Sequence, residues 1–169
     1  MKQSRLAATC GMTAALSVVI MLIGGILGLG MYVSPMIAGV CLIPVGRAFG
    51  RKYHALMWLA VSLLCFILVP NIEENLMYLT LFGVYPLLRP VFQQLRPVLR
   101  WLVKLLFFNA VVIAVEALVV LLLVPEVMTA GMAVLLLAMG NVTFILYDRI
   151  LPRIEFLLMR RLSRIKWMH

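Results

Sequence analysis

The chain has 169 residues, of which 65% are hydrophobic and 12% are charged, and its mean hydropathy is +1.13. This composition excludes an ordinary water-soluble domain, in which about a quarter of the residues are charged, and it indicates an integral membrane protein. The formal net charge of +9 would suggest nucleic-acid binding in a soluble protein. Here membrane orientation and anionic lipid account for the charge, so we expect contacts with anionic lipid and no nucleic-acid partner.

The Lys and Arg residues fall into four clusters, and a pair of apolar segments separates each cluster from the next. The clusters are Lys2 and Arg5; Arg47, Arg51 and Lys52; Arg89, Arg96, Arg100 and Lys104; and Arg149, Arg153, Arg160, Arg161, Arg164 and Lys166. Short loops rich in Lys and Arg stay in the cytoplasm. The alternation therefore predicts an all-α integral membrane bundle of six transmembrane helices with both termini cytoplasmic. We expect one domain over residues 1–169, located in the cell membrane.

The six expected crossings differ in length. The first, about residues 6–27, is long enough to span a bilayer, and the fifth, about 105–124, and the sixth, about 127–147, are full-length; the third runs over about 54–69. The second, 32–46, and the fourth, 75–88, are short and contain prolines; at 1.5 Å per residue they reach only about 21–24 Å of a ~30 Å hydrocarbon core. Such crossings indicate either a bundle with a recess open to one side or a locally thinned bilayer.

The first segment carries a ridge of small residues, Ala7, Gly11 and Ala15, at four-residue spacing. Small residues at this spacing let another helix approach closely. Inside the bundle the ridge would be ordinary packing, whereas on the outside it would be a docking face for a partner subunit. The glycines that follow, from Gly24 to Gly30, predict a helix end or close packing, because no Lys completes a phosphate-binding loop.

The fourth segment carries an aromatic stripe that starts at an acid: Glu74, Tyr78, Phe82 (or Leu81) and Tyr85 recur at helical spacing. Core packing and a ligand wall are both compatible with this pattern. The two tyrosine hydroxyls need hydrogen-bond partners inside a membrane, and a bound polar solute is one candidate.

Glu116 lies in the fifth segment, about 12 Å below its outer end by helix rise. A carboxyl at that depth is costly and is a candidate functional site, the alternative being a protonated Glu bonded to a neighbouring helix. Asn109 and Asn141 lie at equal distances on either side of Pro125. An antiparallel hairpin would place the two amides at equal depth, where a hydrogen bond could join the helices; we favour this structural role over ligand binding. Glu116 and Val134 are also equally far from Pro125 along the chain, so the same hairpin would place Val134 opposite Glu116.

The sequence contains no recognisable nucleotide loop, zinc motif, nucleophilic serine motif or pair of catalytic carboxylates. We therefore expect neither an enzyme nor a cofactor. The stretch 89–100 alternates basic and apolar residues and predicts a linker on the lipid headgroups. The tail, about 152–169, predicts a basic amphipathic helix on the inner leaflet, or a docking surface for a cytoplasmic partner.

In architecture, the chain resembles the substrate-binding S component of energy-coupling factor (ECF) transporters. The ridge on the first segment, the run 5–19 and the small-residue-rich run 34–46 carry the resemblance, which covers about the first 65 residues in sequence. It implies a substrate-capture subunit for a vitamin or similar micronutrient. It also implies that Ala7, Gly11 and Ala15 dock onto a transmembrane T component, and that paired ATPases hydrolyse ATP.

The resemblance places the pocket for the small-molecule solute near the extracellular side. The candidate solute-binding residues are Tyr32, Glu74, Tyr78, Tyr85, Asn109, Glu116 and Asn141. The identity of the solute is open. The first alternative to the transporter function is a non-transport structural or scaffolding membrane protein similar to the rod-shape protein MreD. The second is a small membrane enzyme or ion carrier centred on Glu116.

Overall fold

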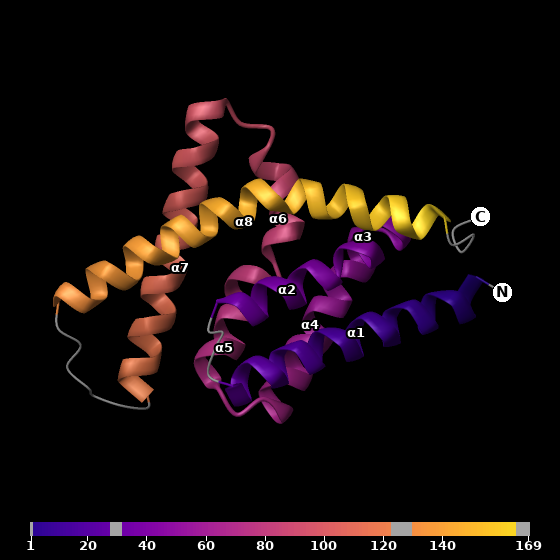
Figure 1. Cartoon of the computed structure of the whole chain (residues 1–169), viewed down its shortest axis with the longest axis horizontal. Coiled ribbons are helices and arrows are strands. Elements are labelled where there is room, and N and C mark those ends of the chain that lie inside the picture. The colour runs from indigo at the N-terminus through magenta and orange to yellow at the C-terminus, as the bar shows by residue number, and fades with distance from the viewer. Residues whose placement is uncertain (1, 28–31, 123–129, 165–169) are drawn as a thin grey trace.

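A computed structural model describes residues 2–27, 32–122 and 130–164, and every regular element within these ranges is a helix. The elements are α1 (Lys2–Leu27), α2 (Val33–Cys41), α3 (Ile43–Phe49), α4 (Arg51–Leu68), α5 (Ile72–Met77), the π-helical turn η1 (Tyr78–Phe82), α6 (Tyr85–Phe92), α7 (Pro97–Leu122) and α8 (Ala130–Arg164). The expected all-α fold class is confirmed for these residues. Figure 1 shows that the start of α1 and the end of α8 lie on the same side of the molecule.

Four helices, α1, α4, α7 and α8, are long and apolar enough to cross a membrane. Their outward faces carry large apolar side chains, such as Ile67, Leu106 and Leu121, which are 79%, 69% and 81% exposed. Water-soluble proteins rarely expose continuous apolar faces of this kind, whereas lipid tails solvate them without penalty. These four helices correspond to the first, third, fifth and sixth expected crossings.

The second expected crossing is broken into two helices. α2 ends at Cys41 and α3 begins at Ile43, with Pro44 in its first turn. Proline lacks an N–H and fits the start of a helix. The N–H groups of Val45 and Gly46 both bond the carbonyl of Leu42, so the backbone is satisfied across the break. The whole stretch Val33–Phe49 is apolar but shorter than a full span.

The fourth expected crossing is also discontinuous and is divided into α5, η1 and α6. The wide turn η1 is closed by a bond of 2.8 Å from the Gly83 N–H to the Tyr78 carbonyl. Trp58 of α4 donates to the Leu79 carbonyl at 3.1 Å, which satisfies a backbone acceptor within the protein. Gly39 of α2 faces the Phe82 carbonyl so closely that a Cβ at Gly39 would overlap it. α2 therefore packs directly on the backbone of the π-helical turn.

The linker contains more helix than the sequence predicts, whereas the tail is helical up to Arg164, as predicted. α6 continues to Phe92 and α7 begins at Pro97, so only residues 93–96 of the expected linker are outside helices. Proline is favoured at the first position of a helix, which explains the early start of α7. α8 continues through Pro152 to Arg164, so the tail extends the sixth segment up to that residue. Residues 165–169 lie outside the described residues.

The helices α7 and α8 cross each other rather than running side by side (Figure 1). At the crossing Phe108 stacks on Phe144 with ring centroids 4.7 Å apart. Gly140 lies against the same Phe108 ring, since the absence of a side chain there lets the helices approach. These rings belong to the larger of two buried apolar clusters, which also contains Tyr85 and Leu81 of the fourth segment.

Candidate functional site

Two carboxyl groups from different helices meet at one end of the molecule. Glu73 begins α5, Glu116 lies on α7, and their side chains hydrogen-bond to each other. A hydrogen bond between two carboxyl groups requires that one of them holds a proton. Burial, the charge of Glu116 and this hydrogen bond raise the pKa of Glu73 to about 7. Glu73 therefore holds a proton in the folded protein at pH values at which an ordinary carboxyl has lost it.

A third carboxyl, Glu74, is fully buried beside this pair. Its Oε1 accepts a short hydrogen bond from the Ser34 hydroxyl of α2, and its Oε2 has no hydrogen-bond partner among the described residues. Burial raises the pKa of Glu74, against the opposing effect of the Ser34 hydrogen bond. We call Glu73, Glu74 and Glu116 the acidic cluster.

The local sequence explains how three acids come to lie together. Asn71 caps α5 by accepting hydrogen bonds from the backbone N–H groups of Glu73 and Glu74, at 3.1 and 3.3 Å. Acids in the first turn of a helix are stabilised by its dipole. A Cβ at Gly24 or Gly25 of α1 would overlap Glu74 or its neighbours. The prediction of close packing at these two glycines is confirmed, while Gly28 and Gly30 lie outside the described residues.

A pocket of about 390 Å³ lies beside the acidic cluster. It is lined by Gly25, Pro70, Asn71, Ile72, Glu73 and Val119. Glu73 is its ionisable group, and the hydrogen bond to Glu116 fixes the orientation of that carboxyl. Carboxylates accept strong hydrogen bonds from N–H groups and pair with cations, so the pocket suits a solute that presents an amine or another cationic group.

Tyr32, a predicted solute-binding residue, lies close enough to the acidic pair for its hydroxyl to be affected by it. Glu116 and Glu73 are the two charged groups that interact electrostatically with its hydroxyl. The structure thus brings Tyr32, Glu74 and Glu116 together at one end. The sequence did not single out Glu73 as a site residue, although its position next to Glu74 was a usable signal.

The expected position of Glu116 opposite Val134 is wrong. Glu116 faces Glu73 of α5, whereas Val134 is 67% exposed and a Cβ at Gly131 would meet no atom within 4 Å. The expectation assumed an extended antiparallel hairpin. Because α7 and α8 cross (Figure 1), equal distance along the chain gives equal depth only near the crossing point.

The predicted amide contact lies at that crossing and is confirmed. Asn109 donates to the Asn141 side-chain oxygen at 2.9 Å, and Asn141 donates to the Asn109 side-chain oxygen at 2.8 Å. Each amide also donates to the carbonyl one turn earlier, that of Leu105 or Leu137. Both amide groups are satisfied within the helix pair and need no ligand.

The aromatic stripe of the fourth segment belongs to the core. Tyr78, Leu81, Phe82 and Tyr85 are fully buried, and neither tyrosine lines the pocket beside Glu73. The Tyr85 hydroxyl donates to Asp148 of α8, while the Tyr78 hydroxyl has no hydrogen-bond partner among the described residues. A protein carboxylate, rather than a solute, is therefore the partner of Tyr85.

Asp148 is a functional candidate that the sequence analysis missed. It accepts hydrogen bonds from Tyr85 and from Lys104 of α7, the latter at 2.7 Å, and its Oδ1 lies 3.4 Å from Nε of Arg89. Arg89 also pairs with Glu155 at 3.6 Å, and Glu155 pairs with Arg47 of α3. The signal in the sequence was a lone Asp after a long apolar run and next to a basic cluster.

The small-residue ridge of α1 faces outward. Ala7, Gly11 and Ala15 are exposed, and a Cβ at Gly11 would meet no atom within 4 Å. Of the two interpretations left open by the sequence, packing inside this chain's own bundle does not apply within the described residues. The ridge is available to another molecule.

Within the described residues no group of three or more His, Cys, Asp or Glu side chains is arranged to hold a metal ion. No protein-family model, curated protein or solved structure matches the sequence. A functional proposal must therefore start from the acidic cluster, the outward ridge and the arrangement of the helices.

Proposed function

We propose that this chain is the substrate-capture subunit of a cell-membrane transporter and crosses the bilayer six times. Four helices of spanning length and two short, broken segments support this topology. The basic residues of α3 and α6 lie towards one end of the bundle. The acidic cluster lies towards another end. With the basic end in the cytoplasm, the acidic cluster faces outward, where a solute arrives.

The pair formed by Glu73 and Glu116 is the observation that carries this proposal. Two carboxyl groups from separate helices are hydrogen-bonded to each other beside a pocket. A carboxyl near the membrane interior is expensive to maintain and marks a functional site. A solute with an amine or another cationic group can replace the proton of Glu73 and pair with the carboxylates. We propose this chemistry for a vitamin or a similar micronutrient.

The outward ridge supports a docking role. A partner helix can approach the backbone of α1 closely at Gly11, because no side chain among the described residues fills that space. By its resemblance to S components, the chain would dock there onto a transmembrane T component, and the paired ATPases would supply the energy. The absence of a nucleotide-binding loop from this sequence fits that division of labour.

Co-purification with a T component and its two ATPases tests the docking role. Gly11→Leu places bulk on the ridge and should abolish complex formation, while the isolated protein stays folded. Gly131→Leu is the matched control, since Gly131 of α8 is also exposed and open, and it should leave the complex intact. If Gly11→Leu assembles as well as the parent chain, the docking role is wrong and the scaffolding alternative gains support.

Solute capture is tested by mass spectrometry of whatever small molecule co-purifies with the protein, followed by calorimetry. For a cationic solute, Glu116→Gln removes a buried charge partner, which typically weakens binding by about 2–5 kcal/mol, or very roughly 30- to 5,000-fold. Asn109→Leu is the control, because its amide is satisfied at the helix crossing. Equal affinity in Glu116→Gln and the parent chain would remove the acidic cluster from the solute site.

A further inference from the structure

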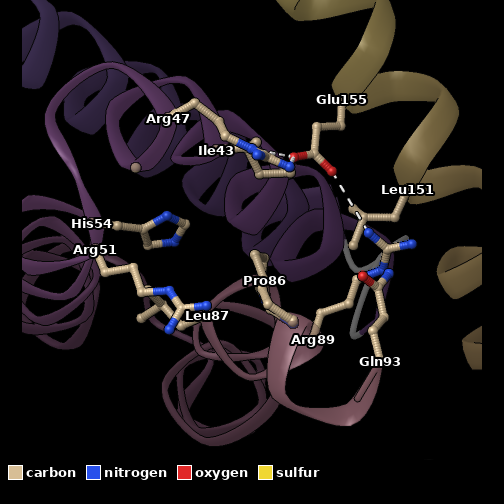
Figure 2. A pocket seen from close by; sticks show the side chains of 12 residues that line it. Ile43, Arg47, Arg51, His54, Pro86, Leu87, Arg89, Gln93, Leu151 and Glu155 are labelled. Atoms are coloured by element: carbon tan, nitrogen blue, oxygen red, sulfur yellow. Dashed lines mark hydrogen bonds and ion pairs between the residues drawn. The ribbon is translucent and has the colours of Figure 1, made fainter. Parts of the chain in front are cut away.

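A second pocket, of about 370 Å³, lies at the basic end of the molecule between α3, α4, α6 and α8. Its polar lining consists of Arg47, Arg51, His54, Arg89, Gln93 and Glu155. Figure 2 shows these side chains arranged around a common space, with Pro86 and Ile43 forming apolar parts of the wall. The volume falls in the range of small-molecule sites.

Positive charge is in excess in this pocket. Glu155 pairs with Arg47 and with Arg89, and Asp148 compensates Arg89 and Lys104. Three basic side chains, those of Arg47, Arg89 and Lys104, thus share two carboxylates. Arg51 adds a further positive charge, and none of the ion pairs among the described residues involves it.

The start of α4 adds to this excess of positive charge. Gly50 is its N-cap and provides no side-chain cap, and the first turn contains no acid. The first N–H groups of a helix are unsatisfied and carry a partial positive charge, which favours an anion and disfavours basic side chains. Arg51 and Lys52 occupy this turn nonetheless. A bound anion would relieve this local repulsion.

His54 lines the same pocket from α4. The residue is 4% exposed, and its ring hydrogen-bonds to the Gly83 backbone, so it forms a fixed part of the pocket wall. Figure 2 shows the His54 ring and the Arg51 side chain extending from α4 on one side of the pocket, across from Arg89 and Glu155.

We propose that this pocket binds a phosphate group that enters from the basic end. Arg51 would hydrogen-bond its oxygens, and Arg47 and Arg89 would complete the positive surroundings. A phosphate has several acceptor oxygens and fits arginine forks. The headgroup of an anionic phospholipid and the phosphate of a soluble molecule present the same chemistry. The site lies at the end of the molecule away from the acidic cluster and does not depend on solute capture.

The test uses the full chain, stripped of lipid in an uncharged detergent, in two arms. One arm titrates inorganic phosphate against chloride at equal ionic strength by calorimetry. The other counts bound phosphatidylglycerol against phosphatidylcholine by native mass spectrometry. We expect saturable binding of one molecule in at least one arm, and the arm that responds identifies the source of the phosphate.

Arg51→Gln should weaken that binding by about ten- to a hundredfold, because it removes a charge-assisted hydrogen bond. Lys52→Gln is the matched control: it removes the same charge from the next, exposed residue, which does not line the pocket, and it should change the affinity less than about twofold. The proposal is overturned if neither arm saturates in the parent chain, or if Lys52→Gln weakens binding as much as Arg51→Gln.

Discussion

The ammonium group of Lys104 lies 2.7 Å from Oδ2 of Asp148, and the two side chains are only 3% and 6% exposed. This ion pair joins α7 to α8 in the interior of the bundle. Tyr85 and Arg89 of the fourth segment contact the other oxygen of the same carboxylate. Asp148 thus connects three of the expected crossings.

The effects of removing Lys104 and Asp148 should be unequal. Asp148→Asn leaves Lys104 and Arg89 with one less negative charge in a buried position, and breaking a buried pair in this way typically costs about 3–5 kcal/mol. Lys104→Gln should cost less, because Asp148 keeps Arg89 and Tyr85 as partners. Thermal unfolding in detergent, followed by circular dichroism, should give the lower midpoint for Asp148→Asn. The reverse order would show that Arg89 does not compensate Asp148.

The amide pair at the helix crossing predicts a measurable coupling. Asn109→Leu and Asn141→Leu each leave one amide without its partner. Interhelical hydrogen bonds in membrane proteins are worth about 0.6 kcal/mol on average and at most about 1.7 kcal/mol. With two reciprocal bonds, we expect a coupling energy of about 1 kcal/mol in a double-mutant cycle on unfolding free energies. Additive effects of the two substitutions would mean that the bonds contribute nothing to stability.

Loop charge and local patterns were enough to predict the helical class, the bounds of the first helix and the Asn109–Asn141 contact. These depend on periodicity and on distance along the chain, which a sequence displays directly. The partner of Glu116 was not predictable in this way. It depends on how steeply α7 crosses α8 and on α5 packing against α7, and neither relation leaves a periodic signal.

The Asp148 network was missed for a different reason. Arg89 and Lys104 look like ordinary positive-inside loop residues, because α7 begins eight residues earlier than the apolar pattern suggests. Once α7 begins at Pro97, Lys104 lies two turns inside the helix and can reach α8. The sequence therefore displayed both basic residues of this network, but they were interpreted as loop residues.

The topology has its own test. After Cys10, Cys41 and Cys65 are replaced by Ala, a cysteine at Ile72 should react with a membrane-impermeant thiol reagent in intact cells. A cysteine at Gln93 should react only after permeabilisation, because this position lies between Arg89 and Arg96 in a basic cluster. Both positions are exposed in the structure, so lack of labelling cannot be due to burial in this chain. Labelling of Gln93→Cys from outside would contradict six crossings with a cytoplasmic basic end.

The acidic cluster predicts a pH dependence of stability with a definite sign. The pKa of Glu73 is raised from 4.5 to about 7 in the folded protein, chiefly by burial, so between these values the folded state holds a proton that the unfolded state has lost. Stability must therefore fall as the pH rises from about 4.5 to about 7; Glu74, whose pKa is also raised, acts in the same direction. We expect the thermal midpoint in detergent to decrease over this window, and Glu73→Gln to flatten the decrease, because the amide keeps the neutral form at every pH.

Lys52→Gln, at the other end of the molecule, should leave the slope unchanged. A midpoint that rises with pH over this window, or an equal slope in Glu73→Gln, would mean that Glu73 is ionised in the folded protein and holds no proton with Glu116.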